Sequence, residues 1–148
     1  MTRGMVATVL HRMAGGPKIT YEALFPDVPS GKYYSVAVTW AAKNKVVSGY
    51  ASDKKFRPGT NVTREQLATM LYNYAHMLGL DISARADLTA YKDGKQVSSY
   101  AQKPMSWAVA NGILSGTKEG ELKAKNDATR AEAAKMLLNL YKLIEKSK

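Results

Sequence analysis

Cysteine is absent from this chain of 148 residues, which excludes disulfide bonds and thiolate metal sites. No apolar run approaches the roughly 20 residues that a membrane-spanning helix needs. Met1-Thr2-Arg3-Gly4 leads straight into an amphipathic segment and lacks the pattern of a secretory signal peptide. The chain also lacks a glycine-rich phosphate loop, a nucleophile elbow and a cluster of metal-ligating residues. We therefore expect no catalytic residue, no cofactor and no metal, and favour a binding or structural module over an enzyme.

Acidic residues are few compared with basic ones, 12 against 22, and the net charge is +10. Hydrophobic residues make up 45% of the chain, a globular composition rather than a disordered one. The excess positive charge favours a polyanionic partner. Nucleic acid, an anionic membrane and an acidic polysaccharide all remain open on charge alone.

The chain contains internal repeats, which decide how the rest of the sequence is interpreted. Similar segments begin with Thr-Arg at Thr2, Thr63 and Thr129, spaced 61 and 66 residues apart, and a second block begins at Trp40 and at Trp107, 67 residues later. The near-equal spacing predicts the last helix of an incomplete repeat at 1–16, a complete repeat at 17–83 and a complete, more divergent repeat at 84–148. We therefore expect the chain to be a fragment of a longer protein.

Each Thr-Arg segment is predicted to be a helix, because apolar residues recur at the i, i+3, i+4 and i+7 positions of one face. Thr63 and Thr129 are suited to be N-caps, and Gln66 and Glu132 three residues later complete two capping boxes. Met5 stands at that position in the first copy and leaves its cap half made. The fold predicted is mainly α-helical.

The Trp blocks are predicted to be shorter helices. Asn111-Gly112 is a suitable C-terminal stop for the second of them, and at the end of the first we expect Asn44 to take the left-handed conformation. Gly49 and Gly116 follow, where they would permit turns with positive φ or allow a ligand to approach the backbone.

An arginine directly follows each N-cap, at Arg3, Arg64 and Arg130. A cation there opposes the helix dipole and is unfavourable by about 0.3 to 1 kcal/mol, so it calls for an explanation. One explanation is a bound anion, with free backbone N–H groups and the guanidinium converging on a carboxylate. The alternatives are ion pairs, such as Arg64 with Asp27 or Arg130 with Asp93, and a solvated side chain lying along its neighbour.

Other candidate residues carry two interpretations each. Trp40 and Trp107 could stack on a sugar ring or belong to the core. Asp27 and Asp93 could orient the arginines or simply cap the Trp helices and their lead-in turns.

The order and spacing of these elements resemble the S-layer homology (SLH) domain family. The residues that carry the resemblance in the middle repeat are Phe25-Pro26-Asp27-Val28, Tyr33-Tyr34, Trp40-Ala41, Val46-Val47-Ser48-Gly49, Phe56-Arg57-Pro58 and Val62-Thr63-Arg64-Glu65. The last repeat matches more loosely, with Leu122 in place of the aromatic Phe56 and Ala124-Lys125 in place of Pro58-Gly59.

The resemblance implies tandem helical repeats around a shared pseudo-threefold bundle, the first repeat truncated, at the cell wall or S-layer of a Gram-positive or related bacterium. It implies non-catalytic, non-covalent anchoring to an acidic, pyruvylated secondary cell-wall polysaccharide held in grooves between repeats. The residues expected to bind it are, in order of their surroundings, Arg64, Arg130 and Arg3, joined by Asp27, Asp93, Trp40, Trp107, Gly49 and Gly116. We expect neither nucleic acid nor membrane as a partner.

Two alternatives to polysaccharide anchoring remain. The first is a protein-interaction or self-assembly module of a surface layer, including self-association through the incomplete repeat. The second is a basic nucleic-acid binder, which the charge permits although the lysines are scattered.

Overall fold

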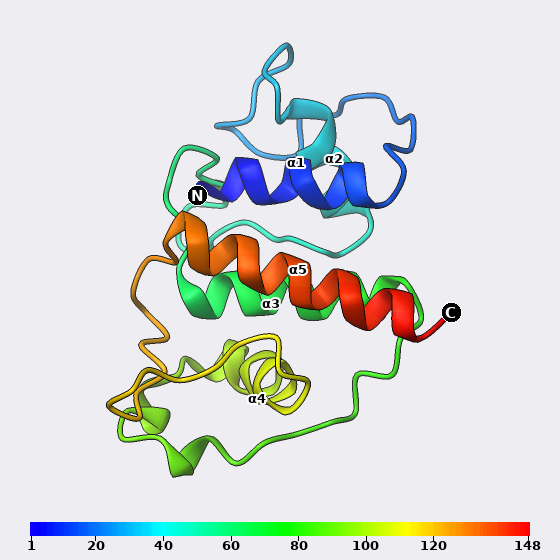
Figure 1. Ribbon diagram of the computed structural model, residues 1–148. Helices are drawn as coiled ribbons and strands as arrows, with labels where there is room; N and C mark the ends of the chain where they lie inside the picture. The colour runs from blue at the N-terminus through cyan, green and yellow to red at the C-terminus, as the bar shows by residue number, and fades with distance from the viewer. The chain divides into compact units, whose positions relative to one another are not determined.

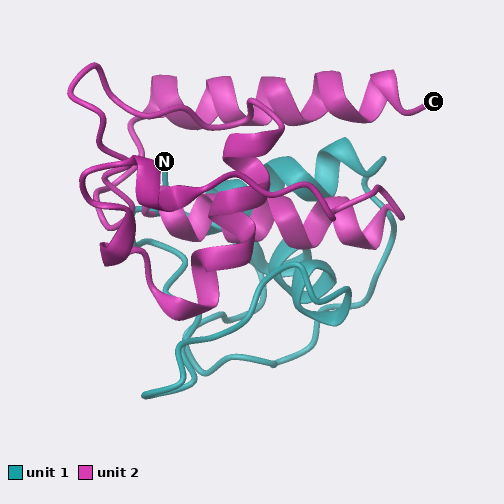
Figure 2. Ribbon diagram, turned by 90° about the horizontal axis from the view of Figure 1, so that it is seen from below, with its two compact units in different colours: residues 1–62 teal, residues 63–148 magenta.

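The computed structural model describes all 148 residues, and the predicted helical fold is confirmed. The chain forms two compact units, Met1–Val62 and Thr63–Lys148 (Figure 2). No helix is both long and apolar enough to cross a lipid bilayer.

Unit 1 consists of two packed helices, α1 (Arg3–Met13) and α2 (Ser35–Lys43), with long connecting loops (Figure 1). Val6, Ala7 and Leu10 of α1 are fully buried, as is Ala41 of α2. The end of the unit returns to its beginning, because Thr2 and Asn61 form an antiparallel bridge and the Val62 N–H donates to the Met1 carbonyl. The start of α1 is thereby held beside the loop that follows α2.

Unit 2 repeats this arrangement and adds a helix. It contains α3 (Arg64–Met77), α4 (Gln102–Ala110) and α5 (Arg130–Lys146), with short 3₁₀ turns η1 (Leu88–Ala90), η2 (Gly94–Gln96) and η3 (Ser99–Ala101) before α4. The helix α3 packs against both α4 and α5. Thr63 and Asp127 form the bridge that corresponds to Thr2 and Asn61.

The compact units are offset from the sequence repeats. In each unit the Thr-Arg helix of one repeat packs against the Trp helix of the next, α1 against α2 and α3 against α4. The aromatic contacts correspond as well: the rings of His11 and Trp40 are 5.2 Å apart, and those of Tyr72 and Trp107 are 5.6 Å apart. Each unit therefore contains a complete contact between neighbouring repeats.

The helix starts agree with the sequence prediction. The hydroxyls of Thr63 and Thr129 accept from the N–H groups of Gln66 and Glu132, whose side chains bond back to the caps. At α1, Thr2 accepts from the Met5 N–H and the reciprocal bond is missing, as expected. These bonds satisfy part of the set of N–H groups that a helix start leaves without intrahelical partners.

The end of α2 differs from the prediction. Asn44 has φ −92°, and Lys45 takes the left-handed conformation with φ 60°. The Val46 N–H donates back to the Ala41 carbonyl, and the same bond joins Ile113 to Ala108 around Gly112, whose φ is 67°. This Schellman bond fixes which residue must be left-handed. The expectation for Asn44 was therefore wrong, and Lys45 occupies the place of a glycine.

Candidate functional site

Arg3 and Arg64 are buried, with exposures of 5% and 6%, and both bind loop carbonyls of their own unit. Arg3 Nε donates to the Phe56 carbonyl at 2.7 Å and its Nη2 to the Ser48 carbonyl at 3.2 Å. Arg64 Nε donates to Leu122 at 2.9 Å and Nη2 to Ser115 at 3.1 Å. The two acceptors are 66 and 67 residues beyond those of Arg3, so the repeats reproduce the contact.

The first-turn N–H groups of the same helices are also occupied. Arg64 N–H donates to the Asn126 carbonyl at 2.9 Å and Glu65 N–H to Ala124 at 2.8 Å. The corresponding bonds in unit 1 join Arg3 to Thr60 and Gly4 to Pro58, both at 2.9 Å. The loop carbonyls thus take the place at the positive helix end that we had expected an external carboxylate to fill.

Arg64 has a third partner, because its Nη1 lies 2.5 Å from Glu132 Oε2 at the start of α5. The pairing of Arg64 with Asp27, one alternative drawn from the sequence, is therefore not present. Glu132 also accepts from the Thr129 N–H at 2.8 Å. One carboxylate thus completes the cap of α5 and neutralises the buried guanidinium of α3.

Arg130 differs from the other two arginines. It is exposed, and neither its guanidinium nor its backbone N–H has a partner within the chain. Its expected ion pair with Asp93 is not formed, because the Asp93 carboxylate is used elsewhere. Of the three cations at helix starts, Arg130 is thus the one available to a partner outside residues 1–148.

Asp27 and Asp93 hold the loops in place. The Asp27 carboxylate accepts from the Phe56 and Arg57 N–H groups at 2.9 and 2.7 Å. Asp93 accepts from Leu122 and Lys123 at 2.7 and 2.8 Å. Burial alone would raise the pKa of Asp93, but these backbone donors and the charge of Arg64 lower it below its ordinary value. Each aspartate therefore fixes a loop from one side while an arginine fixes it from the other.

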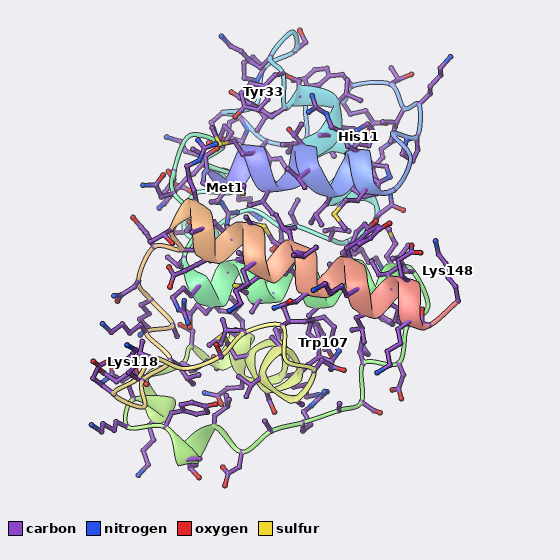
Figure 3. All side chains as sticks on the ribbon, viewed as in Figure 1. Met1, His11, Tyr33, Trp107, Lys118 and Lys148 are labelled. Carbon is purple, nitrogen blue, oxygen red and sulfur yellow. The ribbon has the colours of Figure 1, made fainter.

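Both tryptophans belong to the core. Trp40 is 4% exposed and Trp107 is 0% exposed, so neither ring presents a face to a sugar. The Trp107 Nε1 is buried without a hydrogen-bond partner (Figure 3). Sugar stacking, which the sequence left open for these residues, is not available in this structure.

Gly49 and Gly116 do not have the positive φ expected of them. A Cβ on Gly49 would lie 2.9 Å from the Phe25 ring, and one on Gly116 would lie 2.5 Å from the Tyr91 ring. The space that glycine leaves is filled by the chain's own aromatic residues. These glycines therefore serve internal packing, and the interpretation that they admit a ligand to the backbone is wrong for this structure.

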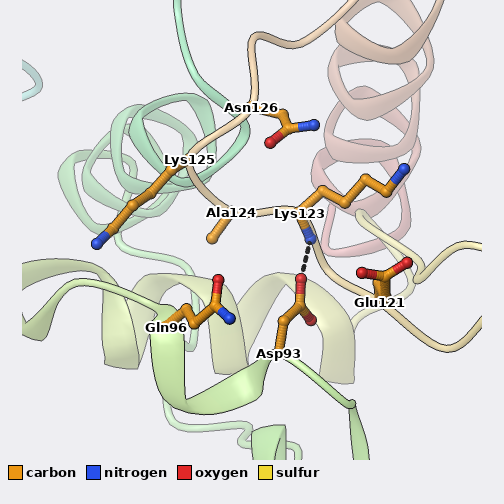
Figure 4. A pocket seen from close by; sticks show the side chains of 7 residues that line it. All are labelled: Asp93, Gln96, Glu121, Lys123, Ala124, Lys125 and Asn126. Atoms are coloured by element: carbon orange, nitrogen blue, oxygen red, sulfur yellow. Dashed lines mark hydrogen bonds between the residues drawn. The ribbon is translucent and has the colours of Figure 1, made fainter.

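Unit 2 contains a polar pocket of about 270 Å³ beside the arginine-held loop (Figure 4). One wall is formed by η2 and its cap, and the other by the loop. Figure 4 shows the side chains of Lys123 and Lys125 extending to opposite sides of Ala124, across from Asp93 and Gln96. The lining residues are Asp93, Gln96, Glu121, Lys123, Ala124, Lys125 and Asn126.

Sequence reasoning named only Asp93 among these lining residues. The signal for the others was the departure from the family pattern at Ala124-Lys125, which places a lysine where the middle repeat has Gly59. A second group that was missed surrounds Glu65, which is buried and accepts from the Ser98 N–H at 3.0 Å and the Ser98 hydroxyl at 2.6 Å. That carboxylate ties α3 to the segment that leads into α4.

The Glu132 carboxylate makes unit 2 sensitive to acid. The Thr129 N–H and the charge of Arg64 lower the pKa of Glu132 against the opposing effect of burial. Because the folded pKa is depressed, the stabilisation is present above the unfolded pKa and is lost as pH falls through the folded value. Glu132→Gln keeps the cap, as Gln66 does in α3, and removes the charge.

We expect Glu132→Gln to lower the free energy of unfolding by about 1 kcal/mol at pH 7, and the difference to disappear below about pH 4. Urea unfolding of both proteins across this pH range measures it. A difference that persists at pH 3 would show that the effect is steric rather than electrostatic.

Comparison with known proteins gives consistent results. The S-layer homology domain model matches residues 24–68 and 90–134, more than half of the chain. An amylopullulanase of Thermoanaerobacterium thermosulfurigenes is 31% identical over 99% of this chain and 8% of its own length. A cellulosome-anchoring protein of Acetivibrio thermocellus is 23% identical over 93% of the chain and 31% of its own length.

Among solved structures, an undecaheme cytochrome from the S-layer of Carboxydothermus ferrireducens aligns with a TM-score of 0.51 and 22% identity. The alignment covers 97% of this chain and 22% of the cytochrome chain, and at that identity it supports the fold alone. In all three cases the chain spans less than a third of the protein it resembles.

Proposed function

This chain belongs to the S-layer homology domain family, whose members are non-catalytic cell-surface anchoring modules, and we propose that it binds an acidic secondary cell-wall polysaccharide through the polar pocket of unit 2. Non-covalent anchoring of a larger protein to the wall of a Gram-positive or related bacterium follows from this proposal. Its support is the small share of each relative that the chain covers, and the printed name of the cellulosome-anchoring relative.

The observation that carries the proposal is the pairing of Lys123 and Lys125 with neutral hydrogen-bonding groups around one pocket. The amides of Gln96 and Asn126 can donate to and accept from sugar hydroxyls, and a lysine ammonium can neutralise a carboxylate such as that of a pyruvate ketal. The net charge of +10 attracts the same kind of polymer at longer range.

Arg64 has an indirect role in this proposal. Its bonds to Leu122 and Ser115, and the bonds of its helix start to Ala124 and Asn126, hold the loop that presents the lysines. Asp93 holds the same loop from the other wall. We assign Arg64 and Asp93 as positioning residues, and by the same geometry Arg3 and Asp27 hold the corresponding loop of unit 1.

Lysine substitutions test the pocket. Lys123→Gln and Lys125→Gln should each weaken binding to purified wall polymer by about 10-fold or more, the loss expected for one charge-assisted hydrogen bond. Lys118→Gln is the matched control, because it removes the same charge from an exposed residue in the loop after α4 that does not line the pocket (Figure 3). Titration calorimetry with native and ketal-free polymer gives the affinities.

Each outcome of this experiment has a clear meaning. Equal losses for all three variants would indicate only general charge attraction and contradict the pocket. Undiminished binding to the ketal-free polymer would contradict the carboxylate as the recognised group. Failure of the unsubstituted chain to bind any wall polymer would contradict the proposed function of residues 1–148.

A further inference from the structure

The helix α5 exposes a face that is buried on the two other Thr-Arg helices. Repeat spacing makes Ala131, Ala134 and Leu138 the counterparts of Gly4, Ala7 and His11 on α1. Their counterparts on α3 are Glu65, Ala68 and Tyr72. Ala7 and Ala68 are 0% exposed, whereas Ala134 is exposed and Leu138 is 50% exposed. Tyr141, one turn further, is 51% exposed although its counterpart Ala75 is fully buried.

The structure shows what covers this face on the other helices. The cover is a half-repeat, by which we mean the lead-in turns, the Trp helix and the arginine-held loop, residues 17–62 in unit 1 and 84–128 in unit 2. On α1 the cover places Trp40 against His11, and on α3 it places Trp107 against Tyr72. It also supplies the two carbonyls that each buried arginine binds.

The start of α5 lacks the same partners. The backbone N–H groups of Arg130 and Ala131 bind no carbonyl, while those of Arg64 and Glu65 bind Asn126 and Ala124. The Arg130 guanidinium is exposed, while that of Arg64 is buried among three acceptors. An apolar stripe, two free N–H groups and a free guanidinium thus coincide on one helix face, in the order in which a half-repeat binds them elsewhere.

Both half-repeats of this chain are already engaged, one with α1 and the other with α3. We propose that the exposed face of α5, formed by Arg130, Ala131, Ala134, Leu138 and Tyr141, is a docking surface for a third half-repeat of the S-layer homology type. The Trp helix of that partner covers Leu138 and Tyr141, and its loop carbonyls accept from Arg130. This inference does not depend on polysaccharide binding.

The test supplies the partner covalently. A copy of residues 17–62 is joined in front of Thr2, so that its last residue precedes Thr2 as Val62 precedes Thr63. Hydrogen exchange of the Arg130 and Ala131 amides is then compared with that of the 148-residue chain, and we expect it to slow by about 10-fold or more. Arg130→Ala should lower the folding equilibrium constant of the extended protein by about 10-fold or more while changing that of the 148-residue chain little.

Lys146→Ala, an exposed change near the other end of α5, is the matched control and should have no such dependence on the added half-repeat. Unchanged amide exchange, or an Arg130→Ala effect equal in both proteins, would overturn the proposal. So would concentration-dependent dimerisation of the 148-residue chain that Leu138→Asp abolishes, because a second copy would then be the partner of this face.

Discussion

Arg64→Ala is expected to lower the free energy of unfolding of unit 2 by about 3 to 5 kcal/mol, whereas Arg130→Ala should change stability by no more than about 0.5 kcal/mol. The two arginines occupy the same position after the N-cap of their helices, and their sequence context is nearly the same. The contrast follows from burial, because Arg64 is 6% exposed and Arg130 is exposed.

The cost at Arg64 has two sources. Truncation leaves the carbonyls of Leu122 and Ser115 without their donors, and it leaves Glu132 without the cation 2.5 Å away. Arg64→Lys should recover part of the loss, because the charge remains while the planar fork that reaches three acceptors does not. Urea unfolding followed by far-ultraviolet circular dichroism measures all three variants.

Equal and small effects of Arg64→Ala and Arg130→Ala would contradict the structural role of Arg64. They would return it to the set of residues available to an external anion. Polymer binding by folded Arg64→Ala protein gives an independent readout, because a positioning residue is expected to affect affinity through the loop that carries Lys123 and Lys125. Adding Lys125→Gln to Arg64→Ala should then cost less than Lys125→Gln alone.

The parts of this fold that are encoded locally were predictable. The Thr-x-x-Gln and Thr-x-x-Glu patterns located the starts of α3 and α5, because both capping partners lie within one turn of the helix. The apolar spacing identified Leu67, Met70 and Leu71 as a buried face for the same reason. Such features need no knowledge of how distant segments meet.

The arginine partners could not be predicted in the same way. Physical reasoning from the helix dipole correctly indicated that something negative must lie beside Arg64. The acceptors are backbone carbonyls more than 50 residues away, at Leu122 and Ser115, and any residue type has a carbonyl. A side-chain carboxylate is visible in a sequence and a carbonyl is not, which is why the ligand interpretation and the Asp27 pairing were considered first.

The glycines show the same limit from the opposite side. Gly49 and Gly116 were assigned to turns with positive φ, but their lack of a Cβ is needed for packing against Phe25 and Tyr91. The residues that do take the left-handed conformation include Lys45 and Lys123. Hydrogen bonds of the surrounding loops impose that conformation, and the residue type does not reveal it.

Gly94→Ala is expected to be the most disruptive small substitution in the chain, with a loss of more than about 4 kcal/mol in the stability of unit 2. A Cβ at this position would lie 1.8 Å from the Leu88 carbonyl oxygen and 2.7 Å from its carbon. Both are backbone atoms, so no side-chain rotation relieves the clash. The repeat pattern conceals this requirement, because the corresponding residue of the middle repeat is Val28.

The consequence reaches the proposed binding site through η2. Gly94 begins this turn, Asp93 caps it, and Gln96 at its end lines the pocket. Separating η1 from η2 must therefore move the wall that faces Lys123 and Lys125, and polymer affinity should fall together with stability. Gly59→Ala is the matched control, since its Cβ meets nothing within 4 Å and its φ is not positive.

The control should be neutral or stabilising by about 0.4 to 1 kcal/mol, through the lower entropy of the unfolded chain. Thermal unfolding and polymer titration of both variants give the comparison. If Gly94→Ala retained full stability and affinity, η1 and η2 could separate at no cost, and the pocket wall would be a movable element. Loss of stability with full affinity in the folded fraction would instead place the bound polymer away from Asp93 and Gln96.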